Sequence, residues 1–580
     1  MKVSDYVVRF LIQQGVRHVF EVSGGMITHL LDSFRRLGGV QVISVRHEQA
    51  AGFAAEGYAR MTGVPGVALA TSGPGATNLL TAIGSCYFDS TPTVFITGQV
   101  NRHELKGQRD VRQAGFQELD IVAVAKPITK AAWMVDSPEL VPAILTRAFA
   151  TALGGRPGPV LLDVPMDVQR ADIAVAEPQT NSPVPDPNSA ATAETALGGE
   201  VDSLLTSLRG AQRPLLLVGG GLRCAHATET FRKLVSKLGV PAVYSLMGVD
   251  ALSFDDPIRV GMIGSYGNRW ANLAMGRSDW LLVLGSRLDI RQTGSDVAAF
   301  KEGRAIFQVD VQAGEMNQRV TGCHAICSDL NPFIAAMLAQ VSARDCGTRS
   351  AWRAEIAELR ERWPDTAETL GAPGINPNAF MHALAQSSTR ACAFTVDVGQ
   401  HQMWAAQSLR LGPAQRFLTS GGMGSMGFAL PAAVGVAFAC APAPLVVVAG
   451  DGGFQHNIHE LQTIAHHRLP IKMVVLNNRC HGMVRQFQES YFESRFQSTV
   501  WGYSAPDFAK VAVAYDIPGF TVAAESDVPS ALAKLWRDPT TPALLQVMID
   551  ESTPVFPKIA FGRPFTEMEP QAKPIDMEGT

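Results

Sequence analysis

Two short polar turns, Gly450-Asp451-Gly452 and Asn477-Asn478, carry the residue types that could hold a divalent metal and a diphosphate. An Asp carboxylate and an Asn amide offer the hard oxygens that Mg²⁺ prefers, and Mg²⁺ in proteins commonly keeps phosphate oxygens among its ligands. The glycines let the backbone approach phosphates without a Cβ clash, and a helix N-terminus favours negative charge. We therefore expect a Mg²⁺–diphosphate site at these turns.

The two turns follow neighbouring strands of one predicted βαβ unit. An apolar run at 445–449 precedes the first turn, a helix is expected from Asn457 to His467, and a second apolar strand from Leu469 to Leu476. A crossover of this kind is right-handed, so both strands end at the same edge of a parallel sheet. Asp451 and Asn478 are therefore predicted to lie close together.

The composition is that of a large α/β enzyme. With 580 residues the chain is too long for a single core and predicts three domains of ordinary size. A hydrophobic fraction of 46% and 53 glycines fit many strand-to-helix turns. The net charge of −4 gives no reason to expect a nucleic-acid or membrane partner. The eight cysteines show no zinc-type pairing and fit a reducing cytoplasm.

One stretch is apolar enough to raise the question of a membrane span. It runs from Leu430 to Gly450 without a charge, but Pro431, Pro442 and Pro444 interrupt it. We expect a buried helix followed by a buried strand, and no transmembrane segment. The charged first residues predict an amphipathic helix and no signal peptide.

Alternating strand, loop and helix patterns predict three consecutive doubly wound parallel-sheet domains, an α/β fold with boundaries at 1–175, 195–345 and 370–580. Residues 176–197 lack periodicity and are rich in Pro, Ser and Thr, which predicts a linker. The expected strands are VRHVFEVSG, VISVRHE, GVALATSGPG, TPTVFITG and GPVLLDVP in the first domain, PLLLVGGG, VPAVYSLMG, DWLLVLGSR and AIFQVDVQ in the second, and AFTVDVG, RFLTSGG, PLVVVAGDGG, IKMVVLNN and ALLQVMID in the third.

GDG followed by NN at this distance, on three successive doubly wound domains, resembles the thiamine-diphosphate (ThDP) enzymes over essentially the whole chain. The resemblance implies a pyrimidine-binding, a central and a diphosphate-binding domain. It also implies a metal held by Asp451, Asn478 and the backbone carbonyl of Cys480.

Glu48 matches the glutamate of that family. It follows a strand and opens a small-residue helix in RHEQAAGFAAEGYAR. In the family, a glutamate hydrogen-bonded to the pyrimidine ring stabilises the imino form that removes the thiazolium C2 proton. A glutamate at a helix start is also a common favourable cap.

Further segments resemble the loops that line the coenzyme, and Met426 matches the bulky residue that supports its bent form. The positions implied in this way are Gly25, Gly73 and Asn78 in the first domain, and Gln400, His401, Gly424, Met426, Gly450, Gly452, Gly453 and Met483 in the third.

Within the family the chain resembles the catalytic subunit of acetohydroxyacid (acetolactate) synthase. The segments at 115–118, 399–407 and 482–484 carry this resemblance. It implies a small 2-oxo-acid substrate, with pyruvate decarboxylated and its two-carbon unit transferred to a second carbonyl compound. It also implies a homodimer or homotetramer in which Phe116 and Gln117 enter the active site of the neighbouring subunit. A small regulatory subunit is not indicated.

The central domain resembles the segments that hold FAD in the synthase and pyruvate-oxidase branch. Arg291 matches an arginine placed to meet a substrate carboxylate. The FAD positions implied are Gly220, Gly221, Met247, Arg287, Asp289, Arg291, Asp310 and Asp329.

Three departures from the synthase pattern stand out: Met166 replaces a lysine, Phe487 replaces a tryptophan, and Ile290 and the longer 264–270 stretch also differ. Alternatives to an acetolactate-type enzyme are therefore a carboligase with a keto-sugar or other ketone acceptor, a flavin-dependent pyruvate oxidase, and a catalytically silent ThDP-binding subunit. The presence of Glu48 and of both metal-ligand side chains argues against the last.

Overall fold

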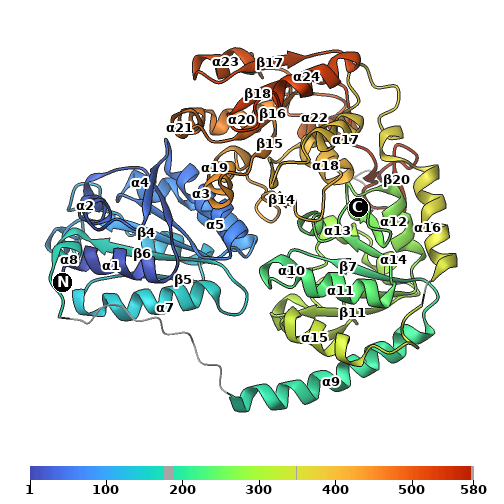
Figure 1. Ribbon diagram of the computed structural model, residues 1–580, viewed down its shortest axis with the longest axis horizontal. Helices are drawn as coiled ribbons and strands as arrows, with labels where there is room; N and C mark the ends of the chain where they lie inside the picture. Colours follow the sequence, from blue (N-terminus) through green and yellow to red (C-terminus); the bar gives the residue numbers. More distant parts are fainter. Residues whose placement is uncertain (175–186, 348, 576–580) are drawn as a thin grey trace.

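A computed structural model describes residues 1–174, 187–347 and 349–575 (Figure 1). Three six-stranded sheets, formed within residues 18–165, 214–327 and 393–548, follow one another along the chain. All strand pairs within these sheets are parallel, and helices separate consecutive strands, so the predicted doubly wound α/β fold is confirmed.

The first sheet has the order β2-β1-β3-β4-β6-β5. Its strands are β1 (His18–Glu21), β2 (Gln41–Ser44), β3 (Gly66–Ala70), β4 (Thr93–Gln99), β5 (Ala131–Met134) and β6 (Pro159–Pro165). Its helices are α1 (Val3–Gln13), α2 (Thr28–Leu37), α3 (Glu48–Thr62), α4 (Pro74–Asn78), α5 (Leu80–Phe88), α6 (Ile121–Ala125), α7 (Val141–Leu153) and α8 (Met166–Arg170). The expected N-terminal helix is α1.

The second sheet has the order β12-β11-β10-β7-β8-β9. Its strands are β7 (Pro214–Val218), β8 (Ala242–Tyr244), β9 (Arg259–Met262), β10 (Trp280–Leu284), β11 (Ala305–Asp310) and β12 (His324–Cys327). The helices of this part are α9 (Pro187–Gly210), α10 (Gly221–Cys224), α11 (Thr228–Leu238), α12 (Arg269–Arg277), α13 (Ile290–Thr293), α14 (Val297–Lys301), α15 (Leu330–Gln340) and α16 (Ser350–Arg362).

The third sheet has the order β14-β13-β15-β16-β18-β17. Its strands are β13 (Ala393–Val396), β14 (Arg416–Leu418), β15 (Leu445–Gly450), β16 (Ile471–Asn477), β17 (Gly519–Val522) and β18 (Ala543–Met548). Its helices are α17 (Pro377–Ser387), α18 (Gln400–Ser408), α19 (Ala429–Cys440), α20 (Asp451–His456), α21 (Leu461–His467), α22 (Gly482–Tyr491), α23 (Phe508–Ala514) and α24 (Val528–Leu535). A small antiparallel pair, β19 (Lys558–Ile559) with β20 (Met568–Glu569), follows.

The linker expectation is corrected in part. Residues 175–186 lie outside the described residues, but α9 already begins at Pro187, so 187–197 are helical. The segment is rich in Ala, a strong helix former, and Pro is well tolerated in the first turn of a helix. Its Ser and Thr content favoured a loop in the sequence interpretation, and helix propensity prevailed.

The uncharged stretch from Leu430 to Gly450 forms the buried helix α19 and the buried strand β15, as expected. No helix in the described part of the chain is long and apolar enough to cross a membrane.

The first and third domains pack together through α3 and α19, which lie side by side in Figure 1 and make an extensive contact. Their backbones approach so closely that a Cβ on Gly57 would overlap the carbonyl oxygen of Ala432, and one on Gly435 that of Ala54. Glycine and alanine therefore permit a contact that larger side chains would prevent.

Candidate active site

The βαβ unit that carries the two polar turns forms as predicted. Strands β15 and β16 pair in parallel, with Gly450 opposite Leu476, so Asp451 and Asn478 follow strands at the same sheet edge. The helix expected from Asn457 to His467 is observed as a 3-10 turn (η8, Ile458–Glu460) followed by α21, but a separate helix, α20, already begins at Asp451 and was not predicted. The glycines lower helix propensity in the sequence, but only a glycine fits at 453, where a Cβ would lie 2.7 Å from Oδ1 of Asp397.

A cavity lies at this edge and encloses about 890 Å³ of space, its open mouth included. We call it the metal-turn cavity. All the third-domain positions implied for coenzyme and metal line it: Gln400, His401, Gly424, Met426, Gly450, Asp451, Gly452, Gly453, Asn478, Cys480 and Met483. The sequence prediction therefore groups residues that do share one cavity.

The Asp451 carboxylate has unused capacity for a cation. The side chain is buried; Oδ1 accepts the N–H of Gly452 at 2.9 Å, while Oδ2 has no hydrogen-bond partner among the described residues. Burial raises the pKa of Asp451 to about 7. A buried, unpaired carboxylate oxygen is costly, and a bound cation would offset that cost. Oδ1 of Asn478 nearby accepts only the N–H of Cys480, at 3.3 Å.

The donor set is sparse in charged groups. No cluster of three or more His, Cys, Asp or Glu side chains that could hold a metal occurs among the described residues. A cation here would have one carboxylate, one amide and backbone oxygen, with the remaining ligands from a bound phosphate compound or water. That set fits Mg²⁺, which rarely uses all-protein cages.

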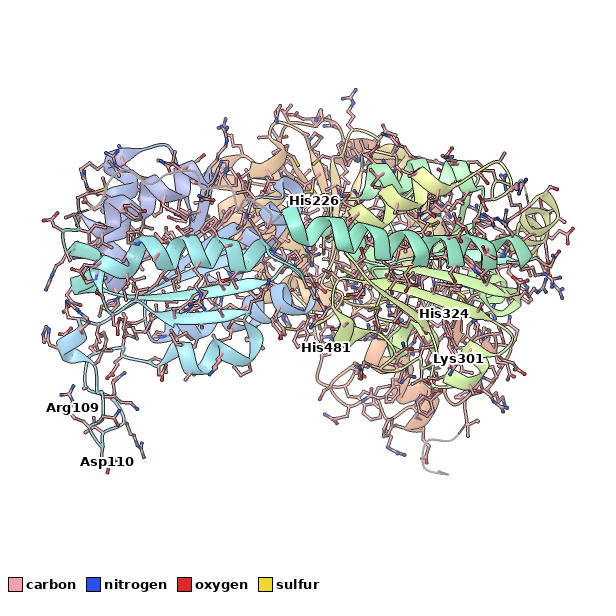
Figure 2. The ribbon with its side chains drawn as sticks, turned by 90° about the horizontal axis from the view of Figure 1, so that it is seen from below. Arg109, Asp110, His226, Lys301, His324 and His481 are labelled. Atoms are coloured by element: carbon pink, nitrogen blue, oxygen red, sulfur yellow. The ribbon has the colours of Figure 1, made fainter. Side chains whose placement is uncertain are left out.

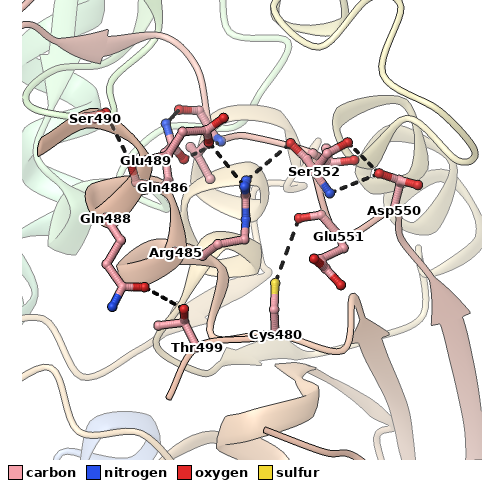
Figure 3. Close-up of polar contacts among 12 residues, drawn as sticks. Cys480, Arg485, Gln486, Gln488, Glu489, Ser490, Thr499, Asp550, Glu551 and Ser552 are labelled. Carbon is pink, nitrogen blue, oxygen red and sulfur yellow. Dashed lines mark hydrogen bonds and ion pairs between the residues drawn. The ribbon is translucent and has the colours of Figure 1, made fainter. Parts of the chain in front are cut away.

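The Cys480 thiol is not available as a metal ligand. Its Sγ lies 3.8 Å from the carbonyl oxygen of Glu551, and burial raises the pKa of the thiol to about 12 (Figure 3). A thiol is also a soft ligand that Mg²⁺ does not favour, which leaves the backbone carbonyl for the predicted role. Figure 3 also shows Arg485 of α22, which donates to the carbonyl of Ser552 at 3.2 Å and ties that helix to the chain after β18.

Glycines bring backbone close to the polar side chains of α18. A Cβ on Gly450 would lie 2.8 Å from the ring of His401, and one on Gly482 would overlap Oε1 of Gln400. Burial lowers the pKa of His401 to about 3, and its Nε2 has no partner among the described residues. A neutral imidazole and several backbone amides therefore surround a space suited to phosphate oxygens.

The first-domain positions form a separate group. Glu48 is the first residue of α3, and its carboxylate accepts the side-chain amide of Asn78 at 2.9 Å. Gly73 has a φ of 61°, and a Cβ there would lie 3.0 Å from the carbonyl oxygen of Gln117. Gly25 opens a short 3-10 helix (η1, Gly25–Ile27). Within one chain, the described residues of this domain contribute nothing to the lining of the metal-turn cavity.

Phe116 and Gln117 lie in a segment that projects from the first domain, with Arg109 and Asp110 near its tip (Figure 2). The Phe116 side chain is 79% exposed, and Gln117 has a φ of 65°. Glu118 organises the segment, since its carboxylate accepts the backbone N–H groups of Lys106 and of Ala114. An apolar ring held so far out is suited to contact another molecule.

A second cavity, which we call the central cavity, encloses about 1290 Å³, its mouth included. All eight positions implied for FAD line it: Gly220, Gly221, Met247, Arg287, Asp289, Arg291, Asp310 and Asp329. Asp289 and Asp329 cap α13 and α15, accepting backbone N–H groups of Arg291 (2.9 Å) and Asn331 (2.8 Å). Burial raises the pKa of Asp310. Carboxylates suit sugar hydroxyls, and the glycine turn at 219–221 suits phosphate.

Among the lining residues that the sequence interpretation missed, three carry ionisable side chains close to the expected ligands. Arg156 and Asp89 reach the central cavity from the first domain, and His481 lines the metal-turn cavity, against Gly452. A cation inside the Gly154–Gly158 turn was the available signal for Arg156. Asp89 carried none, because only domain packing brings it there. The two cavities adjoin, since Arg291 and Met403 line both.

Family models match this architecture part by part. The description "Thiamine pyrophosphate enzyme, N-terminal TPP binding domain" applies to residues 1–124, the central domain to 201–337, and the C-terminal TPP binding domain to 397–547. The chain belongs to the thiamine pyrophosphate (ThDP) enzyme family. The GDG and NN turns lie inside the C-terminal match, and Glu48 lies inside the N-terminal one.

Relatives in this ThDP family extend over nearly the full length. The chain is 36% identical to the large subunit of acetolactate synthase isozyme 2 of Escherichia coli (strain K12), covering 98% of this chain and 99% of that protein. It is 35% identical to the acetolactate synthase large subunit of Lactococcus lactis subsp. lactis (strain IL1403), covering 97% and 95%. The match to chloroplastic acetolactate synthase 2 of Nicotiana tabacum is 35%, over 98% and 85%. The chain is a ThDP-dependent enzyme of the acetolactate synthase type.

Of the departures from the ThDP synthase pattern, Met166, Phe487 and Ile290 lie outside the cavity linings, whereas Ser265 and Tyr266 of the 264–270 stretch line the central cavity. Phe487, 40% exposed on α22, contacts Tyr491 with its ring tilted by 52° and the ring centroids 4.8 Å apart. Met166 is half-buried at the start of α8, and Ile290 is 52% exposed at the start of α13. Met483 and Val484, one helical turn before Phe487, do line the metal-turn cavity. The changed side chains at 166, 290 and 487 therefore surround the cavities, whereas the 264–270 stretch forms part of the central cavity wall.

Proposed function

We propose that this protein is a Mg²⁺- and ThDP-dependent carboligase that decarboxylates pyruvate and transfers the two-carbon unit to a second carbonyl compound, forming 2-acetolactate when that compound is pyruvate. The observation that carries the proposal is the buried Asp451 oxygen, which has no hydrogen-bond partner in the described part of the chain and lies in a glycine-lined cavity shared with Asn478. The relatives, whose printed names are those of acetolactate synthases, support the choice of substrate.

Bound ThDP would supply a nucleophilic carbon that adds to the 2-oxo-acid carbonyl and holds the electron pair released with CO₂. Asp451, Asn478 and the carbonyl of Cys480 would hold Mg²⁺ on the diphosphate. The turn glycines and His401 would contact its oxygens, and Met426 would support the bent form. Arg291, which lines both cavities, would attract the carboxylate of the oxo-acid.

The active site requires a second copy of the chain in this proposal. Glu48 is held by Asn78 away from the metal-turn cavity of its own chain. We assign it the proton relay at the pyrimidine of a coenzyme bound by the partner. The exposed Phe116, with Gln117, would cover the same site. A homodimer, or a tetramer of two such dimers, follows.

The central cavity fits FAD in a structural role, because carboligation moves no electrons to an acceptor. We expect the purified protein to be yellow and its flavin to stay oxidised during turnover. Bleaching of the flavin by pyruvate at the turnover rate would favour the pyruvate oxidase alternative, which the contact between the two cavities makes geometrically reasonable. Cytoplasmic location stays a prediction.

Product analysis tests the proposal. Carbon-labelled pyruvate would be incubated with the protein, ThDP and Mg²⁺, alone and with 2-oxobutyrate, a keto-sugar or a simple ketone, and products identified by mass spectrometry. Labelled 2-acetolactate from pyruvate alone is expected, and the variant Asp451→Ala serves as the inactive control. A labelled adduct formed only with a keto-sugar or ketone would replace this assignment with the alternative acceptor. Labelled acetate with flavin reduction would identify an oxidase.

A further inference from the structure

A single loop, residues 419–428, belongs to both cavities. Its first half, Gly421 and Gly422, lines the central cavity, and its second half, Gly424 and Met426, lines the metal-turn cavity. Ser420 braces the loop across its width, because its Oγ accepts the N–H of Ser425 at 3.1 Å. We call this segment the bridging loop.

Asp89 of the first domain holds one end of the bridging loop. Its two carboxylate oxygens accept the N–H groups of Gly421 at 2.9 Å and Gly422 at 2.6 Å. Arg60 donates to the same carboxylate at 2.8 Å and to the carbonyl of Thr419 at 2.7 Å. The Asp89 side chain is only 2% exposed, so these charge-assisted bonds form out of water, where they are strongest.

Asp397 holds the other end in the same manner. Its two oxygens accept the N–H groups of Gly427 at 2.9 Å and Ala429 at 3.1 Å. This side chain is also buried, at 1% exposure. The bridging loop is therefore fixed at both ends by buried carboxylates: Asp89 accepts two N–H groups of the loop, and Asp397 accepts one from the last residues of the loop and one from Ala429, which follows it.

The central-cavity end of the loop is packed against a residue implied in flavin binding. A Cβ on Gly421 would overlap the sulfur of Met247, and one on Gly422 would lie 2.7 Å from Cβ of Phe88. Contact this close transmits displacement, because packed protein interiors have little free volume. A ligand that orders Met247 therefore also orders the first half of the loop.

We infer that the bridging loop, positioned by Asp89, couples the two cavities, so that a flavin bound in the central cavity raises the affinity of the metal-turn cavity for ThDP. This inference rests on the proposed function, which places FAD and ThDP in these cavities. A flavin packed against Met247 would favour the loop position that Asp89 and Asp397 hold, and ThDP would contact the loop in that same position, so each ligand would favour the state that the other binds. Coupling is reciprocal, so ThDP must raise the affinity for FAD by the same factor. Asp89 is a positioning residue in this scheme and contacts no reacting atom.

The test is a linkage measurement on the full-length protein stripped of ThDP, Mg²⁺ and FAD. ThDP with saturating Mg²⁺ would be titrated by calorimetry without FAD and with saturating FAD. The expected result for the wild type is an increase in ThDP affinity of at least about fivefold with FAD, the lower end of ordinary allosteric coupling. The variant Asp89→Asn keeps the shape of the side chain but weakens its hydrogen bonds to the N–H groups of Gly421 and Gly422. It should lose most of the FAD-dependent increase in ThDP affinity.

The matched control is Asp250→Asn. Asp250 is likewise buried, pairs with Arg223 and Arg416, and accepts the N–H of Phe417, but it holds no residue of the bridging loop. This variant should keep the wild-type increase. If Asp89→Asn does not fold, the milder variant Ser420→Ala takes its place. In that variant the FAD-dependent increase in ThDP affinity, expressed as a logarithm, should fall to less than half of the wild-type value.

The outcomes separate the two proposals. Wild-type protein that binds no ThDP contradicts the proposed function. Protein that binds ThDP and FAD with no effect of one on the other contradicts the inference alone. An increase retained in full by Asp89→Asn and Ser420→Ala would also overturn it, and would assign the coupling to Arg291 and Met403, which line both cavities.

Discussion

The two cavities differ in where their residues come from. The metal-turn cavity is lined by third-domain residues between 398 and 549, with Arg291 as its one contribution from elsewhere among the described residues. The central cavity takes its lining from all three domains, including Asp89 and Arg156 from the first and Gly421 from the third. The metal-turn cavity therefore depends mainly on one βαβ unit, whereas the central cavity also depends on how the domains pack.

Because of this difference, the two cavities should respond to different kinds of substitution. Changes inside the GDG turn should remove ThDP binding outright, because no other described carboxylate lines the metal-turn cavity. Changes at domain contacts should reach the central cavity first.

The largest effect is expected for Asp451→Ala. Removal of the one carboxylate in the metal-turn cavity should abolish retention of ThDP and Mg²⁺, measured by calorimetric titration. FAD affinity, measured without ThDP in both proteins, should equal that of the wild type, because Asp451 does not line the central cavity. Wild-type ThDP affinity in this variant would show that Asp451 is not a ligand.

Glu48→Gln comes next. It keeps a hydrogen-bonding side chain but removes the acidic group, so exchange of the C2 proton of bound ThDP, followed by NMR, should slow by about 10²–10⁴-fold. ThDP affinity serves as the control and should equal that of the wild type. An unchanged exchange rate would rule out the relay role of Glu48.

Arg156→Met tests the central cavity at its domain contact. Arg156 donates to Ser90 at 2.8 Å and pairs with Glu315, which joins the first domain to the second. Loss of hydrogen bonds from a charged group is worth about 1.5–3 kcal/mol, so FAD affinity should fall about 10–150-fold. ThDP affinity measured without FAD should stay within about twofold.

Arg213→Met is the matched control for that variant, since Arg213 pairs with Glu355 away from both cavities. Its FAD affinity should match that of the wild type. Equal losses of FAD and ThDP affinity in Arg156→Met would mean that the central cavity is no more dependent on domain packing than the metal-turn cavity.

The smallest effect is expected for Phe487→Trp. Phe487 lies one turn beyond Met483 and Val484, so it acts on the metal-turn cavity through neighbours. One apolar contact discriminates by only about 1–3 kcal/mol. We predict weak preference for 2-oxobutyrate over pyruvate in the wild type, increased by the substitution and measured by competition with product analysis. If the wild type strongly prefers 2-oxobutyrate and Phe487→Trp does not change that preference, the proposed effect of Phe487 on acceptor choice is wrong.

Within the three six-stranded sheets, the strands that the sequence interpretation missed share one position. β5, β9, β12 and β17 all lie at sheet edges, whereas every interior strand was predicted. Strands buried on both faces read as continuous apolar runs, and edge strands do not. β5 is half-buried throughout and β12 mostly exposed, while β9 opens with the buried Arg259, which stacks on Tyr244.

Site residues follow a similar rule. Asp451 and Asn478 could be predicted because one local unit determines their separation. Asp89 is a short acidic side chain after α5 with no motif around it, and it becomes part of a site only when the third domain folds against the first. Contacts of this kind are set by tertiary packing, and local sequence patterns do not indicate them.

The close crossing of α3 and α19 also bears on how such chains recombine. Because Gly57 and Gly435 lie directly against backbone carbonyls of the opposite helix, the surfaces of the two helices are complementary in shape. A chimera that takes its first domain from one relative and its third from another inherits two surfaces selected against different partners. The first and third domains are therefore expected to be inherited together as one evolutionary module, with the central domain as the exchangeable part.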